Sequence, residues 1–79
     1  MRVQVLVRLK PGVLDVQGKA VEKGLQGLGF SDVDNVRVGR LIELDLESDN
    51  LDDAKAKVSQ MCEKLLVNGV IENFEFCTL

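Results

Sequence analysis

The strongest constraint on the fold is the strict alternation of residues 2–9, RVQVLVRL, at the start of the chain. Four apolar side chains fall on one side of an extended backbone there, namely those of Val3, Val5, Val7 and Leu9. A period of two residues is typical of a half-buried strand, and Pro11 with Gly12 ends the run. The alternation therefore predicts a first strand that contributes one apolar face to a sheet.

A change to helical spacing follows at Asp15. Apolar and small residues then recur at the spacing of one helix face, at Val16, Ala20, Val21, Leu25 and Leu28. Gly29 suits the left-handed position just past a helix end, and Phe30 can fold back onto Leu25, as in a Schellman motif. The pattern predicts a helix that begins after Asp15 and ends before Gly29.

The start of this helix contains two features that local structure does not explain. Asp15 can cap the helix, because its carboxylate can accept hydrogen bonds from the amides of Gln17 or Gly18. Gly18 costs the first turn up to about 1 kcal/mol relative to alanine, so another backbone or side chain is expected close to it. Val13 and Leu14 precede the cap and have no local partner. For this apolar pair, burial in the core and contact with another subunit are both open.

Within residues 33–47, VDNVRVGRLIELDLE, a second alternating pattern allows two structures. Its apolar residues at even positions are Val36, Val38, Ile42, Leu44 and Leu46. A three-residue turn through Leu41 would make a hairpin that pairs Val38 with Ile42 and keeps the two faces separate. One long strand bent at Gly39 keeps the faces separate equally well.

The rest of the chain predicts a helix and a final strand. Asp49 or Asn50 can cap the helix, whose apolar stripe is Leu51, Ala54, Val58, Met61, Cys62 and Leu65. The segment VIENFEFCTL then predicts a strand with Phe74 and Phe76 directed inward. The predicted class is α+β, an antiparallel sheet with two helices on one face, related to the ferredoxin-like fold. The element order is βαββαβ with the hairpin, or βαβαβ with one long bent central strand.

A single domain over residues 1–79 is expected, because so short a chain cannot supply two cores. Such a domain buries only about 60% of its unfolded surface, so it needs a further source of stability. The hydrophobic fraction is 46%, which favours self-association. The far half of a long strand at 33–47 could also pair with another chain. We therefore expect a homo-oligomer, a dimer at least.

Composition and charge argue against several classes of binding protein. The net charge is −3 and the pI is about 4.8, whereas a nucleic-acid-binding protein needs a clustered basic face. The three aromatic residues are too scattered for a base-stacking platform. No segment of the sequence is long and apolar enough to span a bilayer, and the first residues form a strand pattern instead of a signal peptide. We expect a cytoplasmic protein that binds neither nucleic acid nor membrane.

Catalytic chemistry is not indicated by any group of residues. The chain contains no histidine, and its serines and threonine form no catalytic motif. Cys62 and Cys77 lie in a helical and a strand pattern, where cysteine serves as a small apolar filler. They also lack the close spacing of a zinc or redox pair. We therefore expect no catalytic, cofactor-binding or metal-binding residue in this chain.

Three segments, taken in order, resemble the PurS family, the small subunit of phosphoribosylformylglycinamidine synthase. They are LKPGVLDVQGKAV at 9–21, VDNVRVGRLIEL at 33–44 and MCEKLLVNGVIENF at 61–74. The resemblance implies a non-catalytic subunit of an ATP-dependent carbon–nitrogen ligase complex in de novo purine (IMP) biosynthesis. In such a complex a glutaminase subunit releases ammonia. A large synthetase subunit uses ATP and magnesium to activate an amide for attack by that ammonia.

The resemblance also implies that the small subunit bridges the glutaminase and synthetase subunits and binds no cofactor itself. The expected partner interface comprises Val13, Leu14, Asp15, Gln17, Gly18, Arg37 and Arg40. Its two arginines are expected to project from the strand face opposite Val36 and Val38 and to meet a partner's carboxylates. The alternative is a ferredoxin-like module that binds a small regulatory molecule, for which Asp15, Gln17 and Gly18 could form a niche.

Overall fold

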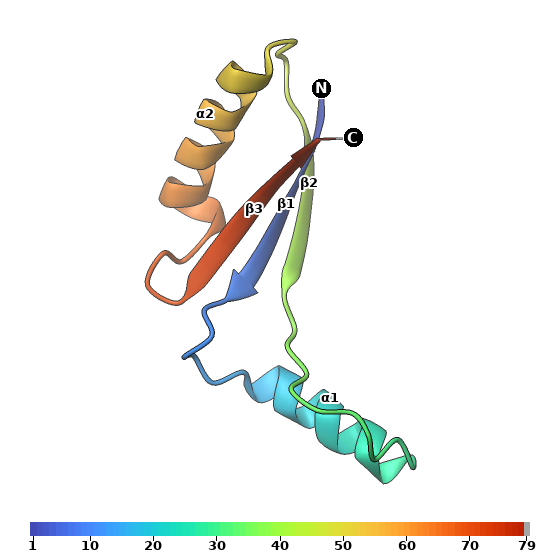
Figure 1. Cartoon of the computed structure of the whole chain (residues 1–79). Helices are drawn as coiled ribbons and strands as arrows, with labels where there is room; N and C mark the ends of the chain where they lie inside the picture. The colour runs from blue at the N-terminus through green and yellow to red at the C-terminus, as the bar shows by residue number, and fades with distance from the viewer. Residues whose placement is uncertain (79) are drawn as a thin grey trace.

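The computed structural model of the chain describes residues 1–78 and contains a sheet and two helices (Figure 1). The elements follow in the order β1 (Arg2–Leu9), α1 (Val16–Gly27), β2 (Arg40–Asp45), α2 (Leu51–Met61), the π-helical turn η1 (Cys62–Leu66) and β3 (Glu72–Thr78). The order of strands in the sheet is β2-β1-β3, and both neighbours of β1 run antiparallel to it. The fold is the predicted α+β class, with the element order βαβαβ.

The alternation of β1 produces one fully buried face of the sheet. Val3, Val5 and Val7 are at most 1% exposed. The register places Val5 beside Ile42 of β2 and beside Phe76 of β3, so the apolar residues of the three strands share this face. Burying a valine side chain completely contributes about 1.5–3 kcal/mol. The central strand is therefore the main source of the core.

Helix α2 covers this apolar face (Figure 1). Ala54 and Val58 of α2 and Cys62, the first residue of η1, recur every four residues along one side, and none is exposed. Val58 and Cys62 pack with the valines of β1. The two ends of the predicted stripe are not covered, since Leu51 is 46% exposed and Leu65 is 84% exposed. The core thus consists of a few small side chains, and the apolar surface that they bury is small for a chain of this length.

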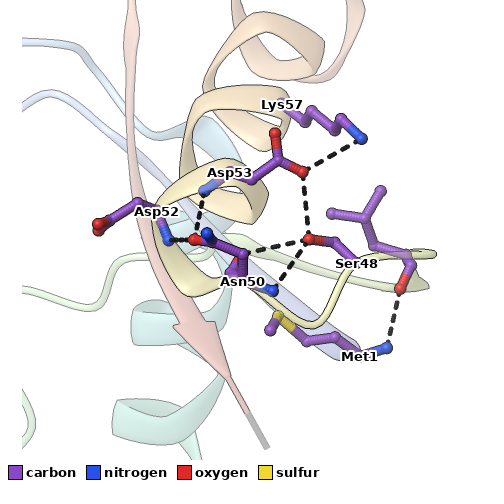
Figure 2. A network of polar contacts seen from close by, with 7 residues as sticks. Met1, Ser48, Asn50, Asp52, Asp53 and Lys57 are labelled. Carbon is purple, nitrogen blue, oxygen red and sulfur yellow. Dashed lines mark hydrogen bonds and ion pairs between the residues drawn. The ribbon is translucent and has the colours of Figure 1, made fainter.

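The start of α2 is held by a network of polar contacts (Figure 2). Of the two predicted caps, Asn50 is the one used, because its side-chain oxygen accepts hydrogen bonds from the amides of Asp52 and Asp53 at 2.9 and 3.2 Å. The Ser48 hydroxyl donates to the Asp53 carboxylate at 3.2 Å, and Lys57 pairs with the same carboxylate at 3.3 Å. Two acidic residues in the first turn also face the positive end of the helix dipole.

The hairpin considered for residues 33–47 does not form. Only residues 40–45 of this segment form a strand, β2, and residues 33–39 leave the sheet. The amides of Val36 and Val38 donate to carboxylates of the α1 region instead of to a strand. At Gly39, just before β2 begins, a Cβ atom would lie 2.5 Å from the carbonyl oxygen of Val7. The strand is consequently shorter than the long bent strand that we considered.

Helix α1 lies beyond the end of the sheet and not on the face covered by α2 (Figure 1). The expectation of two helices on one face therefore holds for α2 alone. The radius of gyration is 15.8 Å and the longest dimension is 48 Å, whereas a compact chain of this length has a radius of about 12 Å. Val16, Leu28 and Phe30 are consequently 73%, 76% and 54% exposed. Periodicity predicted an apolar stripe on α1, but it does not specify the surface that covers such a stripe.

The C-terminal end of α1 has the predicted Schellman geometry. The amide of Phe30 donates to the carbonyl of Leu25 at 3.1 Å, and the amide of Gly29 donates to the carbonyl of Gln26 at 3.1 Å. These are the two hydrogen bonds that define the motif. Gly29 has a φ of 100°, which a residue with a side chain rarely adopts. The glycine therefore ends the helix and turns the chain back toward the sheet.

Candidate partner interface

Most of the residues predicted to meet a partner lie where α1 joins the sheet. Leu14 is 71% exposed and Gln17 is exposed, whereas Val13 is half-buried. Leu14 is thus not part of the core of its own chain. Of the two roles considered for it, contact with another subunit is the one still to be tested. The region where Asp15 and α1 meet residues 36–38 is called the junction below.

Asp15 lies at the centre of the junction and is only 5% exposed. One oxygen of its carboxylate accepts the amide of Gly18 at 2.7 Å, and the other accepts the amide of Val38 at 2.7 Å. The amides of Val38 and Gly18, together with the nearby Arg37 guanidinium, keep the pKa of Asp15 below its ordinary value. A single carboxylate therefore caps α1 and also binds the chain that returns toward β2.

Glu22 continues the same contact one turn further along α1, and the sequence analysis did not single it out. Its side chain is mostly buried, with the residue 9% exposed, and its carboxylate accepts the amide of Val36 at 3.2 Å. Lys19 lies 3.8 Å from the same carboxylate. Glu22 is four residues after Gly18, hence on the same side of the helix. The sequence signal that could have identified Glu22 was this spacing, because a close neighbour was already expected at Gly18.

Asp15 and Glu22 together form what we call the carboxylate clamp. They accept the amides of two alternate residues, Val38 and Val36. Successive amides of a strand point to opposite sides, so alternate residues present their amides to one side. The clamp therefore binds residues 36–38 in the way that the edge of a neighbouring strand would.

Gly18 has no room for a side chain, as its position in the first turn predicted. A Cβ atom there would clash with the carbonyl oxygen of Val36 and would lie 2.8 Å from a carboxylate oxygen of Asp15. The close neighbour is thus the backbone of the returning chain. These contacts also fill the niche that was considered for a small ligand.

Arg37 and Arg40 do not project from the same face, and the expectation for Arg40 was wrong. Arg40 lies opposite Val7, on the side of the sheet covered by α2, because residues 38 and 40 have the same parity. Its guanidinium donates to the carbonyl of Leu66 at 2.8 Å and to the carboxylate of Glu72 at 3.0 and 3.1 Å. The amide of Asn68 and the Arg40 guanidinium in turn keep the pKa of Glu72 below its ordinary value. Arg40 is therefore engaged within its own chain.

A hollow of about 540 Å³ opens at the base of α1, between the end of β1 and the chain entering β2. Its lining includes Leu6, Leu9, Pro11, Arg37, Val38 and Leu41. The Arg37 guanidinium donates to the carbonyl of Lys10 at 3.0 Å. The hollow thus combines apolar walls with one guanidinium.

The polar groups of the junction form hydrogen bonds with the backbone of the same chain.

Other features of the described residues indicate no catalytic or metal chemistry. Cys62 is fully buried, and its burial raises the pKa of its thiol. Within residues 1–78, no three histidine, cysteine or acidic side chains are grouped so as to hold a metal ion. Neither helix in that range has the length and apolar character needed to cross a membrane. What the arrangement offers chemically is an exposed apolar surface with a positioned charge, which suits protein contact.

Comparison with known sequences finds relatives over nearly the whole chain. The family model described as PurS, phosphoribosylformylglycinamidine (FGAM) synthase, matches residues 2–78. The chain is 47% identical over 73 residues to the phosphoribosylformylglycinamidine synthase subunit PurS of Synechocystis, covering 92% of this chain and 73% of that protein. It is 43% identical over 75 residues to the subunit of that name from Bacillus subtilis, covering 95% and 88%.

Comparison with solved structures gives the same result for the backbone. The crystal structure of Methanocaldococcus jannaschii PurS, one of the subunits of formylglycinamide ribonucleotide amidotransferase, has a TM-score of 0.87 at 34% identity, covering 96% of this chain and 92% of that one. A chain in the structure of PurLQS from Thermotoga maritima has a TM-score of 0.89 at 32% identity, covering 99% and 95%. The likeness therefore includes the position of α1 as well as the sheet.

Replacing Asp15 by asparagine is expected to weaken the fold at neutral pH and to reduce its sensitivity to acid. The pKa of Asp15 is lowered in the folded state, so its stabilising contribution is fully present above its unfolded pKa of about 3.9. That contribution is lost as the pH falls through the lower folded pKa. The measurement is the free energy of unfolding in urea from pH 6 to pH 2.5, at one protein concentration. Asp49→Asn, at an exposed position, is the control, and identical curves for Asp15→Asn and the unmodified protein would contradict the assignment.

Gly18→Ala is expected to destabilise the protein, whereas Gly24→Ala is not. Alanine at 18 would clash with the carbonyl of Val36, and overpacking of this kind costs about 1–3 kcal/mol. Nothing lies within 4 Å of the corresponding position at Gly24, so alanine there should add up to about 1 kcal/mol of helix stability. Thermal and urea unfolding of both variants measure the difference. Equal effects of the two substitutions would show that Gly18 is not closely covered.

Proposed function

This chain belongs to the PurS family of phosphoribosylformylglycinamidine (FGAM) synthase subunits, and we propose that it bridges the glutaminase and synthetase subunits of that enzyme. It is the non-catalytic small subunit, acting in purine biosynthesis. The observation that carries this function is the family match over residues 2–78. The structural match to a chain of PurLQS supports it, since that chain was solved as part of an assembly.

An elongated chain with two apolar surfaces suits a bridging role. The chain measures 48 × 26 × 14 Å. One surface follows α1 and includes Leu14 and Leu28, and the other lies around the turn between η1 and β3, where Leu65 and Val70 are 84% and 81% exposed. A bridge must contact more than one protein at once, which requires surfaces on different elements. Exposed apolar residues grouped in this way are typical of contact surfaces.

The same shape supports assembly of the chain with copies of itself, as a homodimer or homotetramer. The apolar stripe of α1 has no cover within the chain, because the helix lies beyond the sheet (Figure 1). β2 and β3 both lie at edges of the sheet, where a further strand can pair. Covering the α1 stripe would supply the apolar burial that the small core lacks.

ATP and magnesium are assigned to the synthetase subunit of the complex and not to this chain. A magnesium–nucleotide site is built from carboxylates that remain free to bind the metal, whereas the two most buried carboxylates here, Asp15 and Glu22, accept backbone amides. We place the complex in the cytoplasm, in line with a biosynthetic role.

Reconstitution is the test of the bridging function. The purified chain alone is expected to hydrolyse neither glutamine nor ATP. Added to the synthetase and glutaminase subunits of the same organism, it is expected to produce glutamine-dependent FGAM formation that the two subunits lack without it. Glutamine, ATP and magnesium are present throughout, because assembly can require them. Full activity of the two larger subunits without the chain would contradict the proposal.

Sedimentation velocity at micromolar concentration tests the self-association of the chain. A dimer or larger species is expected, because a monomer leaves the apolar residues of α1 in water. The mass should fall on dilution if the association is reversible. A single monomeric species across the micromolar range would contradict self-association and would leave the reconstitution result unaffected.

A further inference from the structure

The outer edge of β3 presents backbone groups that have no strand partner among residues 1–78. β3 pairs only with β1, and β2 lies at the other edge of the sheet. The amide of Lys10 donates to the carbonyl of Ile71 at 2.8 Å, so these two residues form a hydrogen-bonded pair of the antiparallel ladder. Every second pair is then bonded in the same way. The N–H and C=O groups of Phe74 and Phe76 consequently point away from β1.

This edge lacks features with which proteins commonly prevent a further strand from pairing. Edge strands are often very short, or they carry lysine or proline. β3 is seven residues long, ENFEFCT, and contains neither of these residue types. Its two carboxylates already form ion pairs within the chain, Glu72 with Arg40 and Glu75 with Arg8, both at 3.0 Å. The edge is therefore suited to receive another strand.

A second hollow, of about 470 Å³, lies between η1 and the first residues of β3, and we call it the edge hollow. Its lining includes Cys62 and Val67 together with Phe74, which is 38% exposed. Phe74 thus belongs both to the lining and to the open edge. A strand paired with this edge would direct every second side chain to the face covered by α2, which is the face where the edge hollow lies.

The groups in and around the edge hollow indicate which kind of strand fits it. Leu65 and Val70, in the turn beside the hollow, are 84% and 81% exposed. The carboxylate of Glu63 contributes to the lining and forms no ion pair among the described residues. The ammonium group of Lys10 donates to the carbonyl of Gly69 at 2.9 Å. An occupant that brings an apolar side chain and a basic one would complement this surface.

We infer that an extended segment of one of the two larger subunits joins the sheet as a strand beside β3, with an apolar side chain in the edge hollow and a basic side chain facing Glu63. The inference rests on the proposed bridging function and names a surface that serves it. Backbone hydrogen bonds to Phe74 and Phe76 would provide affinity, and the edge hollow would provide specificity.

Contact between copies through α1 leaves this surface available. The chain that returns from α1 enters the sheet at β2, whereas β3 forms the opposite edge (Figure 1). A bridging chain needs surfaces for the larger subunits besides those that join its own copies. The edge of β3 meets this requirement.

Hydrogen exchange at single amides tests the added strand. In the isolated chain the amides of Phe74 and Phe76 are expected to exchange rapidly, whereas those of Asn73 and Glu75, which bond to β1, are protected. In the complex with the synthetase and glutaminase subunits, exchange at residues 74 and 76 should slow at least about tenfold. Glutamine, ATP and magnesium are present in both samples. Exchange is quenched at set times, and the chain is then analysed by NMR. Complexes with each larger subunit alone identify the one that supplies the strand.

Substitutions at the edge hollow test the side-chain contacts. Val70→Asp and Glu63→Lys are each expected to raise the dissociation constant for the larger subunits at least about tenfold. Leu51→Asp and Asp49→Lys make the same changes near the start of α2, at exposed positions, and should leave assembly unchanged. Circular dichroism checks that every variant is folded. If Val70→Asp and Glu63→Lys assemble as tightly as the unmodified chain, no partner side chain occupies the edge hollow and the inference is wrong.

The exchange experiment has further contrary outcomes. Unchanged exchange at Phe74 and Phe76 in an active reconstituted complex would overturn the inference and leave the bridging function standing. Protection of these two amides that appears in the isolated chain as its concentration rises would also overturn it, because the added strand would then belong to a second copy. Failure of the chain to assemble with either larger subunit would overturn the bridging function as well.

Discussion

The carboxylate of Asp15 joins the loop after β1, in which Asp15 lies, to the start of α1 and to the chain that returns toward β2. It caps α1 through Gly18 and holds the returning chain through Val38, both at 2.7 Å. Glu22 repeats the second contact at Val36. Residues 36–38 are thus bound to α1 and lie outside β2, which begins at Arg40. The clamp lies beside the hollow, whose lining includes Arg37 and Val38.

The small core explains why such an arrangement suits a subunit better than an independent protein. The fully buried apolar residues are mostly valines, with one alanine and one cysteine, and they come from β1 and from α2 with the first residue of η1. Burial of a few small side chains stabilises a fold only modestly against the entropy of ordering the chain. A second source of burial is available on α1, where the apolar residues face outward. Association with another protein surface would bury these apolar residues of α1.

Ionisable groups in this chain serve structure more than chemistry. Asp15 and Glu22 bind backbone amides, and Arg40 binds Glu72 and the carbonyl that ends η1. A carboxylate that accepts backbone amides has fewer lone pairs left for a metal or a substrate. This is in keeping with membership of the PurS family and with a role that depends on contacts. Arg2, Arg8 and Arg40 form ion pairs with carboxylates, whereas Arg37 donates to the carbonyl of Lys10 and lies near the carboxylate of Asp15.

The sequence by itself determined the local structure of this protein. Alternation placed Val3, Val5 and Val7 on the buried face, and cap and glycine signals located both ends of α1 and the close approach at Gly18. The resemblance of three segments identified the family. Only the tertiary structure decided that α1 leaves the sheet, that Glu22 accepts the amide of Val36, and that Arg40 turns toward Glu72 while Arg37 faces the hollow. The physical reason is that periodicity specifies which side chains share a face of an element, whereas the surface that covers this face is set by contacts between distant residues and between chains.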